Sequence, residues 1–379
     1  MAFRKPQVPQ AKALIIPKLA NMGTCSFKRD LTDEVIPVQI YPRSRYTTLY
    51  PVGRGSFGKV WKVMETRSGK VLAMKEIQKL AAIQKKSVNL VLNERKLLAS
   101  LHHPFLVNMH EAFQDPVFLY IVMDFLPGGD LRYHLCKRRV FTEQETRFFV
   151  ACLLSGLEYL HLNNVVHRDI KPENLVFDEN GYLKITDLGI SRLLCNGEVV
   201  KDSSGTPGYM APETICRLAH GKASDLFAVG VIAYECMTGR RPYVGRTRHE
   251  IRDAMLASQV QLKRSDVPEG WSLESADFIN KLLQRKVEYR LGANGLHEVK
   301  NHSWLRSFPW IDLMEQRLTA PFLPVKADNF DARIIARVAE EAPNAPDESQ
   351  NELFAGYVFD WAQKTEKEQD CVDTEPNCN

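Results

Sequence analysis

The sequence contains no uninterrupted apolar run of about eighteen residues, the length that a helix needs to cross a membrane. The first part of the chain carries lysines and prolines but no continuous apolar core, so we expect no signal peptide. The eight cysteines form no Cys-x-x-Cys pair and have no histidine cluster at zinc spacing. We therefore expect reduced thiols and an intracellular, cytoplasmic protein.

The chain also lacks a strong net charge, with a formal value of +4 over 379 residues, so nothing requires a nucleic-acid partner. Charge is unevenly spread: residues 1–45 carry eight Lys/Arg against three Asp/Glu, and residues 340–379 carry two Lys against eleven Asp/Glu. The simplest interpretation is two solvated tails of opposite sign. A weaker alternative is that the basic arm touches an anionic membrane or a partner. We expect a monomer.

Apolar periodicity predicts a strand-rich part followed by a helical part, with no internal repeat. Residues 45–123 read as strands separated by Gly-bearing turns, with one helix at 87–101. A second helix is predicted from the capping-box pair Thr142 and Glu145 onward. Residues 225–239 are apolar nearly all round, which indicates a buried central helix, and another helix is expected at 275–284.

A glycine-bearing turn, "GRGSFGKV", lies between the first two expected strands and places Gly53, Gly55 and Gly58 together. Glycines let backbone N–H groups approach phosphate oxygens closely. The same spacing occurs in dinucleotide-binding folds, but there the loop leads from a strand into a helix. Here it leads into a strand, which argues against a dinucleotide-binding oxidoreductase.

Lys75 lies in an apolar strand seventeen residues after Gly58, and Glu94 follows nineteen residues later on the expected helix. Taken singly, either side chain could simply face water. Together with the glycine loop they fit the nucleotide site of a kinase.

The stretch "HRDIKPEN" supplies Asp169, Lys171 and Asn174, and "DLGIS" supplies Asp187. Phosphoryl transfer needs metal ligands, a group that receives a hydroxyl proton, and a cation near the moving phosphate. Asp169 suits the hydroxyl and Lys171 the γ-phosphate. Asn174 and Asp187 offer the oxygen ligands that Mg²⁺ prefers beside ATP. The alternative is a polar loop on a helical domain, which does not explain the order of the motifs.

These motifs, together with "APE" at Ala211–Glu213, Asp225 and Arg290, resemble those of protein kinases. The resemblance implies an α+β, two-lobed fold in residues 47–305, with ATP and Mg²⁺ as cofactors and proteins as substrates. The small lobe, 47–123, would hold an antiparallel sheet and one main helix; a hinge, 124–126, would lead into a mostly helical large lobe, 127–305. An arm, 1–46, precedes this domain, and a tail, 306–379, follows it.

The resemblance also implies roles for individual residues. Lys171, two residues after Asp169, and Thr206 before "APE" are similar to serine/threonine kinases, in which the threonine steadies the catalytic groups. Met123 would be the gatekeeper, and Asp130 would face the ribose. The implied ATP-binding residues are Val52, Gly53, Gly55, Ser56, Phe57, Gly58, Val60, Ala73, Lys75, Met123, Asp124, Leu126, Asp130, Glu173 and Asn174.

Three tail segments, Pro321–Pro324, Asn329–Asp331 and Phe354–Phe359, resemble the C-terminal tail of AGC kinases, and the chain as a whole is most similar to the YANK kinases. Val358 stands where such tails often accept a phosphate. We therefore expect the tail aromatics Phe354, Tyr357 and Phe359 to dock on the small lobe by apolar burial alone.

Two segments depart from the family pattern. Leu188 replaces the usual phenylalanine after Asp187, and we expect it to pack with Leu98, Met109 and His167. Asp202 stands where AGC kinases carry an activating phosphothreonine. The hypothesis is that Asp202 pairs with Arg168 and Arg192 and partly orders the activation segment. The rival hypothesis is that Ser203 or Ser204 is phosphorylated.

Acidic residues at Asp130, Glu173 and Glu235 match positions that select arginine upstream of the target, which predicts basic residues at minus two or minus three. Ile190 predicts a preference for threonine over serine as acceptor. An alternative function is a nucleotide-binding pseudokinase scaffold, but no member of the catalytic set is missing.

Overall fold

The computed structural model describes residues 43–54, 58–194, 199–325, 329, 345–361 and 364. Residues 1–42 of the basic arm, the loop residues Gly55, Ser56 and Phe57, the tail residues Phe330 and Asp331 and most of the acidic end lie outside the described residues. Among the helices in the described ranges, none is long and apolar enough to span a membrane.

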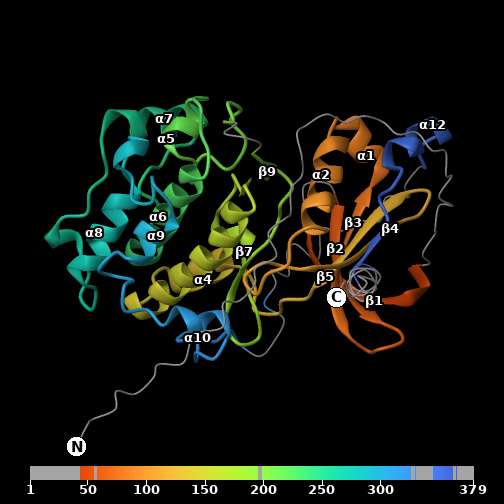
Figure 1. The fold of residues 1–379 in the computed structure, drawn as a ribbon, viewed down its shortest axis with the longest axis horizontal. Coiled ribbons are helices and arrows are strands. Elements are labelled where there is room, and N and C mark those ends of the chain that lie inside the picture. Colours follow the sequence, from red (N-terminus) through yellow and green to blue (C-terminus); the bar gives the residue numbers. More distant parts are fainter. Residues whose placement is uncertain are drawn as a thin grey trace, which may run out of the picture. The chain divides into compact units, whose positions relative to one another are not determined.

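Five strands from the first part of the described chain (Figure 1) and one strand from the tail form a six-stranded antiparallel sheet in the order β1-β2-β3-β5-β4-β10. Neighbouring strands pair in antiparallel fashion; for example, Lys75 of β3 lies opposite Val60 of β2 and opposite Ile121 of β5. The antiparallel small lobe predicted from the sequence is therefore confirmed. Its strands are β1 (Tyr46–Arg54), β2 (Gly58–Glu65), β3 (Val71–Gln78), β4 (Met109–Gln114), β5 (Phe118–Asp124) and β10 (Phe359–Asp360).

Two helices connect β3 to β4: α1 (Lys79–Gln84) and α2 (Val88–Leu98). The sequence predicted α2, whose residues Val91, Leu97 and Leu98 are buried, and Glu94 is buried on the same helix. It predicted neither α1 nor β4. The short α1 is only six residues long, too short to leave a periodic apolar pattern.

The chain after β5 is mostly helical, as predicted. The helix α4 (Glu143–Leu162) begins at the predicted capping box, in which the Thr142 hydroxyl accepts from the Glu145 N–H at 3.2 Å and the Glu145 carboxylate accepts from the Thr142 N–H at 2.8 Å. The helix α6 (Ala223–Thr238) is buried along almost its whole length and contacts both α4 and α8 (Leu273–Leu282).

The helices of this part are α3 (Leu131–Arg138), α4 (Glu143–Leu162), α5 (Pro212–Ile215), α6 (Ala223–Thr238), α7 (Arg248–Ala257), α8 (Leu273–Leu282), α9 (Leu296–Lys300) and α10 (Trp310–Met314). Four short strands form two separate antiparallel pairs: β6 (Val165–Val166) with β9 (Arg192–Leu193), and β7 (Leu175–Phe177) with β8 (Leu183–Ile185). Short 3₁₀ turns lie at Arg43–Arg45, Pro172–Asn174, Arg264–Asp266, Val287–Tyr289 and Glu352–Phe354.

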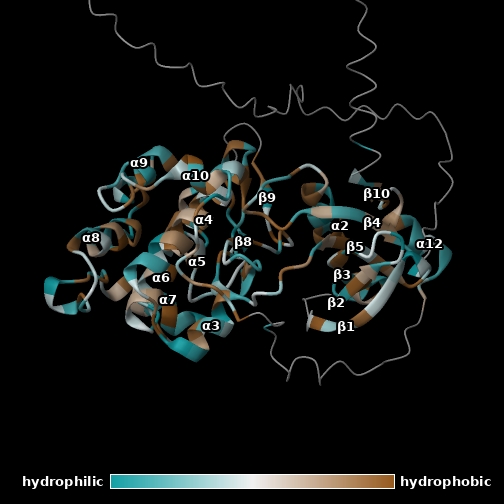
Figure 2. Cartoon of the chain, turned by 90° about the horizontal axis from the view of Figure 1, so that it is seen from below, coloured by the Kyte–Doolittle hydropathy of each residue, from teal (hydrophilic) through white to brown (hydrophobic). Residues whose placement is uncertain are grey.

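The end of the described tail joins the sheet. After the hydrophilic helix α12 (Glu348–Asn351, teal in Figure 2), Phe354 and Tyr357 are 0% and 1% exposed. The strand β10 then pairs with β4, with Phe359 opposite Ala112. The predicted docking of the tail aromatics on the small lobe is therefore confirmed.

Apolar burial is not the whole of this docking, so that part of the prediction is wrong. Arg95 of α2 donates to the carbonyl oxygens of Tyr357, at 2.8 Å, and of Val358. Its guanidinium also lies 5.5 Å from the centre of the Phe359 ring. The sequence could not reveal these contacts, because Arg95 precedes its partners by more than 260 residues.

Candidate functional site

A cavity of about 610 Å³ lies between the sheet and the helical part, within the range of small-molecule sites. Every described residue of the predicted ATP set except Gly58 lines it. From the sheet and the segment after it come Val52, Gly53, Val60, Ala73, Lys75, Met123, Asp124, Leu126 and Asp130; from the helical part come Lys171, Glu173, Asn174, Asp187 and Thr206.

Gly58 lies at the start of β2, where it pairs with Ile77 of β3. A Cβ atom at this position would overlap the Glu76 carbonyl oxygen. A close approach of two strands therefore requires this glycine, whereas the sequence interpretation invoked only phosphate contact.

Lys75 and Glu94 form the predicted ion pair, with Nζ donating to Oε1 at 2.6 Å. Both residues are less than 9% exposed. Burial disfavours the charge on Lys75, but the carboxylates of Glu94 and Asp187 outweigh it and raise the pKa of this ammonium. Lys75 is therefore a fixed cation at the wall of the cavity.

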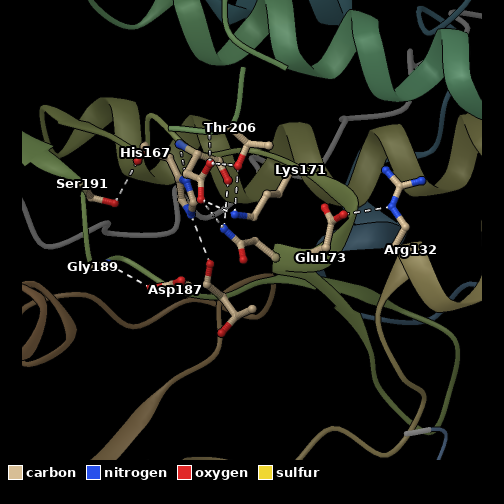
Figure 3. A network of polar contacts seen from close by, with 11 residues as sticks. Arg132, His167, Lys171, Glu173, Asp187, Gly189, Ser191 and Thr206 are labelled. Carbon is tan, nitrogen blue, oxygen red and sulfur yellow. Dashed lines mark hydrogen bonds and ion pairs between the residues drawn. The ribbon is translucent and has the colours of Figure 1, made fainter. Parts of the chain in front are cut away.

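The carboxylate of Asp169 accepts hydrogen bonds from Lys171 and Thr206, which are labelled in Figure 3. Its Oδ1 accepts from the Thr206 N–H at 2.9 Å and from the Thr206 hydroxyl at 2.8 Å, while its Oδ2 accepts from Lys171 Nζ at 2.6 Å. Lys171 Nζ also donates to the Thr206 hydroxyl at 3.0 Å. The three residues that sequence motifs nominated separately thus form one hydrogen-bonded cluster.

Asp225 of α6 holds the backbone of the loop that leads to Asp169. Its carboxylate accepts from the backbone N–H groups of His167 and Arg168, each at 2.9 Å, and contacts His161 Nε2 at 2.9 Å. Burial alone would raise the pKa of Asp225, but the hydrogen bonds from His161 and from the Arg168 backbone N–H help to lower it. The ionised carboxylate stabilises a turn in which Arg168 has a left-handed φ of 71°.

Asp187 also has a left-handed φ, 63°, and one of its oxygens accepts from the Gly189 N–H at 3.2 Å (Figure 3). Burial would raise the pKa of Asp187, but Lys75 and the Gly189 N–H lower it, so the side chain is an anion. The following Leu188 is 4% exposed and shares one apolar cluster with Leu98 and Met109.

The donor set fits a magnesium ion bound together with a nucleotide. The Asn174 amide nitrogen donates to the Asp169 carbonyl at 2.9 Å, which leaves the amide oxygen for a cation. Asp187 supplies an anionic oxygen in the same cavity. Within the described ranges, no three His, Cys, Asp or Glu side chains are grouped to hold a metal alone. One carboxylate and one amide suit Mg²⁺, which keeps waters and phosphate oxygens as its other ligands.

The side chain of Asp124 is engaged in hydrogen bonds with other side chains of the protein. It accepts from Asn108 Nδ2 at 3.1 Å and contacts His110 Nε2 at 2.9 Å. Burial would raise its pKa, but the His110 bond and nearby Lys184 lower the pKa of Asp124 to about 2. The carboxylate of this predicted hinge residue is therefore engaged by Asn108 and His110, while the residue also lines the cavity.

The acidic residues predicted to select a basic substrate, Asp130, Glu173 and Glu235, lie beside an arginine that the sequence analysis did not identify. Arg132 of α3 donates to Glu173 at 2.9 Å (Figure 3) and to both oxygens of Glu235, at 2.9 and 3.2 Å. It also donates to the Tyr209 hydroxyl. No local signal could have revealed Arg132, because its acidic partners lie 41 and 103 residues away.

Asp130, the third acidic residue, caps α3 by accepting from the Tyr133 N–H at 2.7 Å. Burial, assisted by the nearby carboxylate of Glu173, raises the pKa of Asp130 to about 6. This side chain therefore titrates not far below neutral pH.

In the activation segment, Arg168 Nη1 donates to Asp202 at 2.8 Å, and Arg192 lies 3.9 Å from the same carboxylate oxygen. The hypothesised contacts are present. The Ser203 hydroxyl donates to the Thr214 carbonyl at 2.6 Å, whereas the Ser204 N–H donates to Asp202 at 3.1 Å. Ile190 is half-buried just after Gly189.

Comparison with known proteins identifies the same region. Residues 46–305 match the family model described as "Protein kinase domain". A probable serine/threonine-protein kinase of Dictyostelium discoideum is 38% identical over 83% of this chain and 70% of that protein. The RAC-beta serine/threonine-protein kinase A of Xenopus laevis is 39% identical over 74% of this chain and 58% of that protein. The human ribosomal protein S6 kinase alpha-1 is 35% identical over 83% of this chain and 44% of that protein, so the chain spans about half of several longer relatives.

Proposed function

This chain belongs to the protein kinase family, and we propose that it transfers the γ-phosphoryl group of ATP to serine and threonine hydroxyls of protein substrates. One observation carries the proposal: the cluster of Asp169, Lys171 and Thr206 adjoins a cavity that also holds the Lys75–Glu94 pair. A lone cation or carboxylate would support many functions, but this combination suits phosphoryl transfer.

Asp187 and Asn174 would hold Mg²⁺, which neutralises charge on the triphosphate and orients it. Lys75 supplies a further fixed positive charge for the phosphates. Glu94 prevents this ammonium from turning into another position, since the two side chains are bonded at 2.6 Å in a buried environment.

Asp169 would accept the hydrogen bond, and finally the proton, of the substrate hydroxyl. The two bonds from Thr206 to its Oδ1 fix the carboxylate plane. Lys171, bonded to the other oxygen, lies where it can also stabilise charge that develops on the transferred group. Positioning and electrostatics are the main contributions that a protein makes to this reaction.

We propose a preference for basic residues at minus two or minus three in the substrate. Glu173, Glu235 and Asp130 carry three negative charges against the single positive charge of Arg132, so the group retains negative potential. Of the two carboxylates bound to Arg132, Glu173 is the more exposed and is available to a second cation. A degenerate peptide library without enrichment of arginine or lysine at those positions would contradict this preference.

Two finer proposals follow from single residues. Ile190 lies beside the cavity-lining segment Asp187–Leu188, and its branched side chain would favour threonine over serine as acceptor. The tail that docks on the small lobe supports membership of the AGC group, and the YANK kinases remain our assignment within it.

The decisive experiment measures ATP-dependent phosphorylation of a threonine peptide with upstream arginines. Wild type should turn over, whereas Asp169→Asn and Asp187→Ala should lose at least about a hundredfold in kcat. Nucleotide binding, followed by a fluorescent ATP analogue, should survive Asp169→Asn. If wild type binds nucleotide but equals both variants in turnover, the chain is a pseudokinase scaffold instead.

A further inference from the structure

The segment that joins α6 to α7 and opens α7 is strongly basic. Its four arginines, Arg240, Arg241, Arg246 and Arg248, fall within nine residues, and no acidic residue occurs from Gly239 to His249. Arg240 and Arg246 are exposed, and Arg241 and Arg248 are partly exposed. We refer to these four side chains as the arginine cluster.

No ion pair joins the arginine cluster to a carboxylate in the part of the chain that the structure describes. The nearest acid in sequence, Glu250, accepts instead from the backbone N–H of Arg246 at 2.8 Å. Other arginines near the site behave differently: Arg132, Arg168 and Arg290 each bind a carboxylate. The four guanidinium groups of the arginine cluster are therefore available to bind an anion from another molecule.

Two members of the cluster, Arg241 and Arg248, lie against the C-terminal half of the activation segment. Arg248 Nη2 donates to the Ser203 carbonyl at 2.9 Å and lies 3.6 Å from the Met210 sulfur. The Arg241 guanidinium covers Gly208, where a Cβ atom would overlap its Nη1 and approach its Cζ to 3.0 Å. The absence of a side chain at Gly208 thus creates the seat for Arg241.

This segment is part of the site where the acceptor hydroxyl would bind. Thr206, two residues before Gly208, is bonded to Asp169. Tyr209 is contacted by two guanidinium groups, with Arg132 Cζ and Arg241 Cζ each 6.0 Å from the centre of its ring. Its hydroxyl donates to Glu235 at 2.6 Å. Tyr209 therefore joins the acidic group around Glu235 to the arginine cluster.

We propose that the arginine cluster, with Arg241 at its centre, binds an anionic side chain of the protein substrate, either Asp/Glu or a phosphorylated residue. This proposal rests on the proposed kinase function. Guanidinium groups are weakly hydrated and match carboxylate and phosphate geometry bidentately, so they suit this ligand. The substrate would then be read by two neighbouring clusters of opposite sign: a basic residue at the acidic group, and an acidic residue elsewhere in its sequence at the arginine cluster.

The test uses peptides with a fixed acceptor threonine and upstream arginines, in which one aspartate is moved from minus six to plus six. Wild type should prefer aspartate over alanine at one or two positions by about two- to fivefold in kcat/KM, a range expected for a partly exposed charge pair. Arg241→Gln and Arg248→Gln should reduce that ratio to near one. Arg252→Gln is the matched control, since Arg252 lies on the same helix but pairs with Asp253 at 2.8 Å.

Gly208→Ala provides an independent test, because the added methyl group displaces the Arg241 guanidinium without removing its charge. It should lower the aspartate preference while the thermal unfolding temperature stays close to that of wild type. A phosphothreonine at the favoured position should exceed aspartate if the natural ligand is a phosphorylated residue, because phosphate carries the larger charge.

A peptide-binding measurement distinguishes failure of this proposal from failure of the proposed kinase function. Peptides with alanine in place of the acceptor threonine need no turnover, and fluorescence anisotropy should give tighter binding for the aspartate peptide in wild type than in Arg241→Gln. Equal binding and equal kcat/KM of all peptides in wild type overturns the proposal. So does an aspartate preference that persists in the double variant of Arg241 and Arg248.

Discussion

The guanidinium of Arg290 and the carboxylate of Glu213 form a two-pronged, fully buried ion pair, with Nη1–Oε1 at 2.6 Å and Nη2–Oε2 at 2.9 Å. The Arg290 side chain is 0% exposed. The same guanidinium donates to the carbonyl oxygens of Gln284 and Ala223, at 3.1 and 2.9 Å. One side chain thereby ties the end of the activation segment to the start of α6 and to the loop after α8.

Replacing Arg290 by methionine should destabilise the chain by about 3–5 kcal/mol, because it leaves the carboxylate of Glu213 buried without its partner. Chemical denaturation followed by circular dichroism measures this loss. The control is Lys281→Gln, which removes an exposed ion pair with Asp277 on one helix and should cost no more than about 0.5 kcal/mol. Similar losses for both variants would contradict the proposed importance of the buried pair.

Asp202→Ala should lower kcat of unphosphorylated enzyme by about three- to tenfold, the equivalent of roughly 0.7–1.4 kcal/mol. The reason is that the Arg168 side chain, only 6% exposed, would lose its carboxylate partner. Lys201→Ala, at the exposed neighbouring position, is the control. Unchanged turnover in Asp202→Ala would refute the role of this pair.

The Asp202 contact also has a pH dependence. Burial would raise the pKa of Asp202, but the bonds from Arg168 and Ser204 lower it overall. The contribution of the ionised Asp202 to the stability of the folded chain is therefore fully present above the ordinary carboxyl pKa of 3.8, and it is lost as pH falls below that value. Protease sensitivity of the activation segment should rise in acid for wild type and should already be high at pH 7 for Asp202→Ala.

Phe354→Ala should lower the free energy of unfolding by about 3–5 kcal/mol, because the ring is 0% exposed. Leu353→Ala, one residue earlier and 48% exposed, should change it by no more than about 0.5 kcal/mol. Truncation after Glu352 should lower both stability and activity. A truncated chain with wild-type stability and turnover would argue against any structural role for the docked tail.

Asp130→Asn should stabilise the chain at pH 7.5. The folded-state pKa of Asp130, about 6, lies above the ordinary 3.8, so the folded chain binds this proton more tightly than the unfolded chain. The free energy of unfolding therefore falls as pH rises from about 4 to 6, and the cost persists above that range. Asparagine keeps the capping oxygen but has no charge to desolvate.

Thermal unfolding at several pH values measures this effect. The variant should unfold at a higher temperature than wild type at pH 7.5, and the difference should shrink towards pH 4. Glu288→Gln, at an exposed position, controls for the loss of one negative charge. A constant difference between Asp130→Asn and wild type at all pH values would show that Asp130 does not titrate as stated.

Long elements and short motifs were predictable from the sequence for a common reason: their signals are local. The capping box of Thr142 and Glu145 begins α4 as expected, and the chemistry of Asp169, Lys171 and Asn174 lies within six residues. By contrast, β4 has no clean alternation, and it is held in place by β5 on one side and by the distant β10 on the other.

The partners of the predicted residues were harder to foresee. Arg132 joins Glu173 to Glu235, and Asp225 of α6 bonds the backbone of His167 and Arg168, more than fifty residues earlier. Sequence spacing carries no information about such contacts, because they arise only when helices from distant parts of the chain pack together. The same holds for Arg241, whose seat depends on the missing side chain of Gly208.

Strand β10 also has a consequence for the behaviour of the chain in solution. By pairing with β4, the tail supplies hydrogen bonds to a strand that would otherwise be an edge strand of the sheet. The unpaired backbone groups of an exposed edge strand can pair with strands of other molecules. A chain that loses its last segment is therefore expected to self-associate at high concentration, so the tail acts as a built-in guard against aggregation.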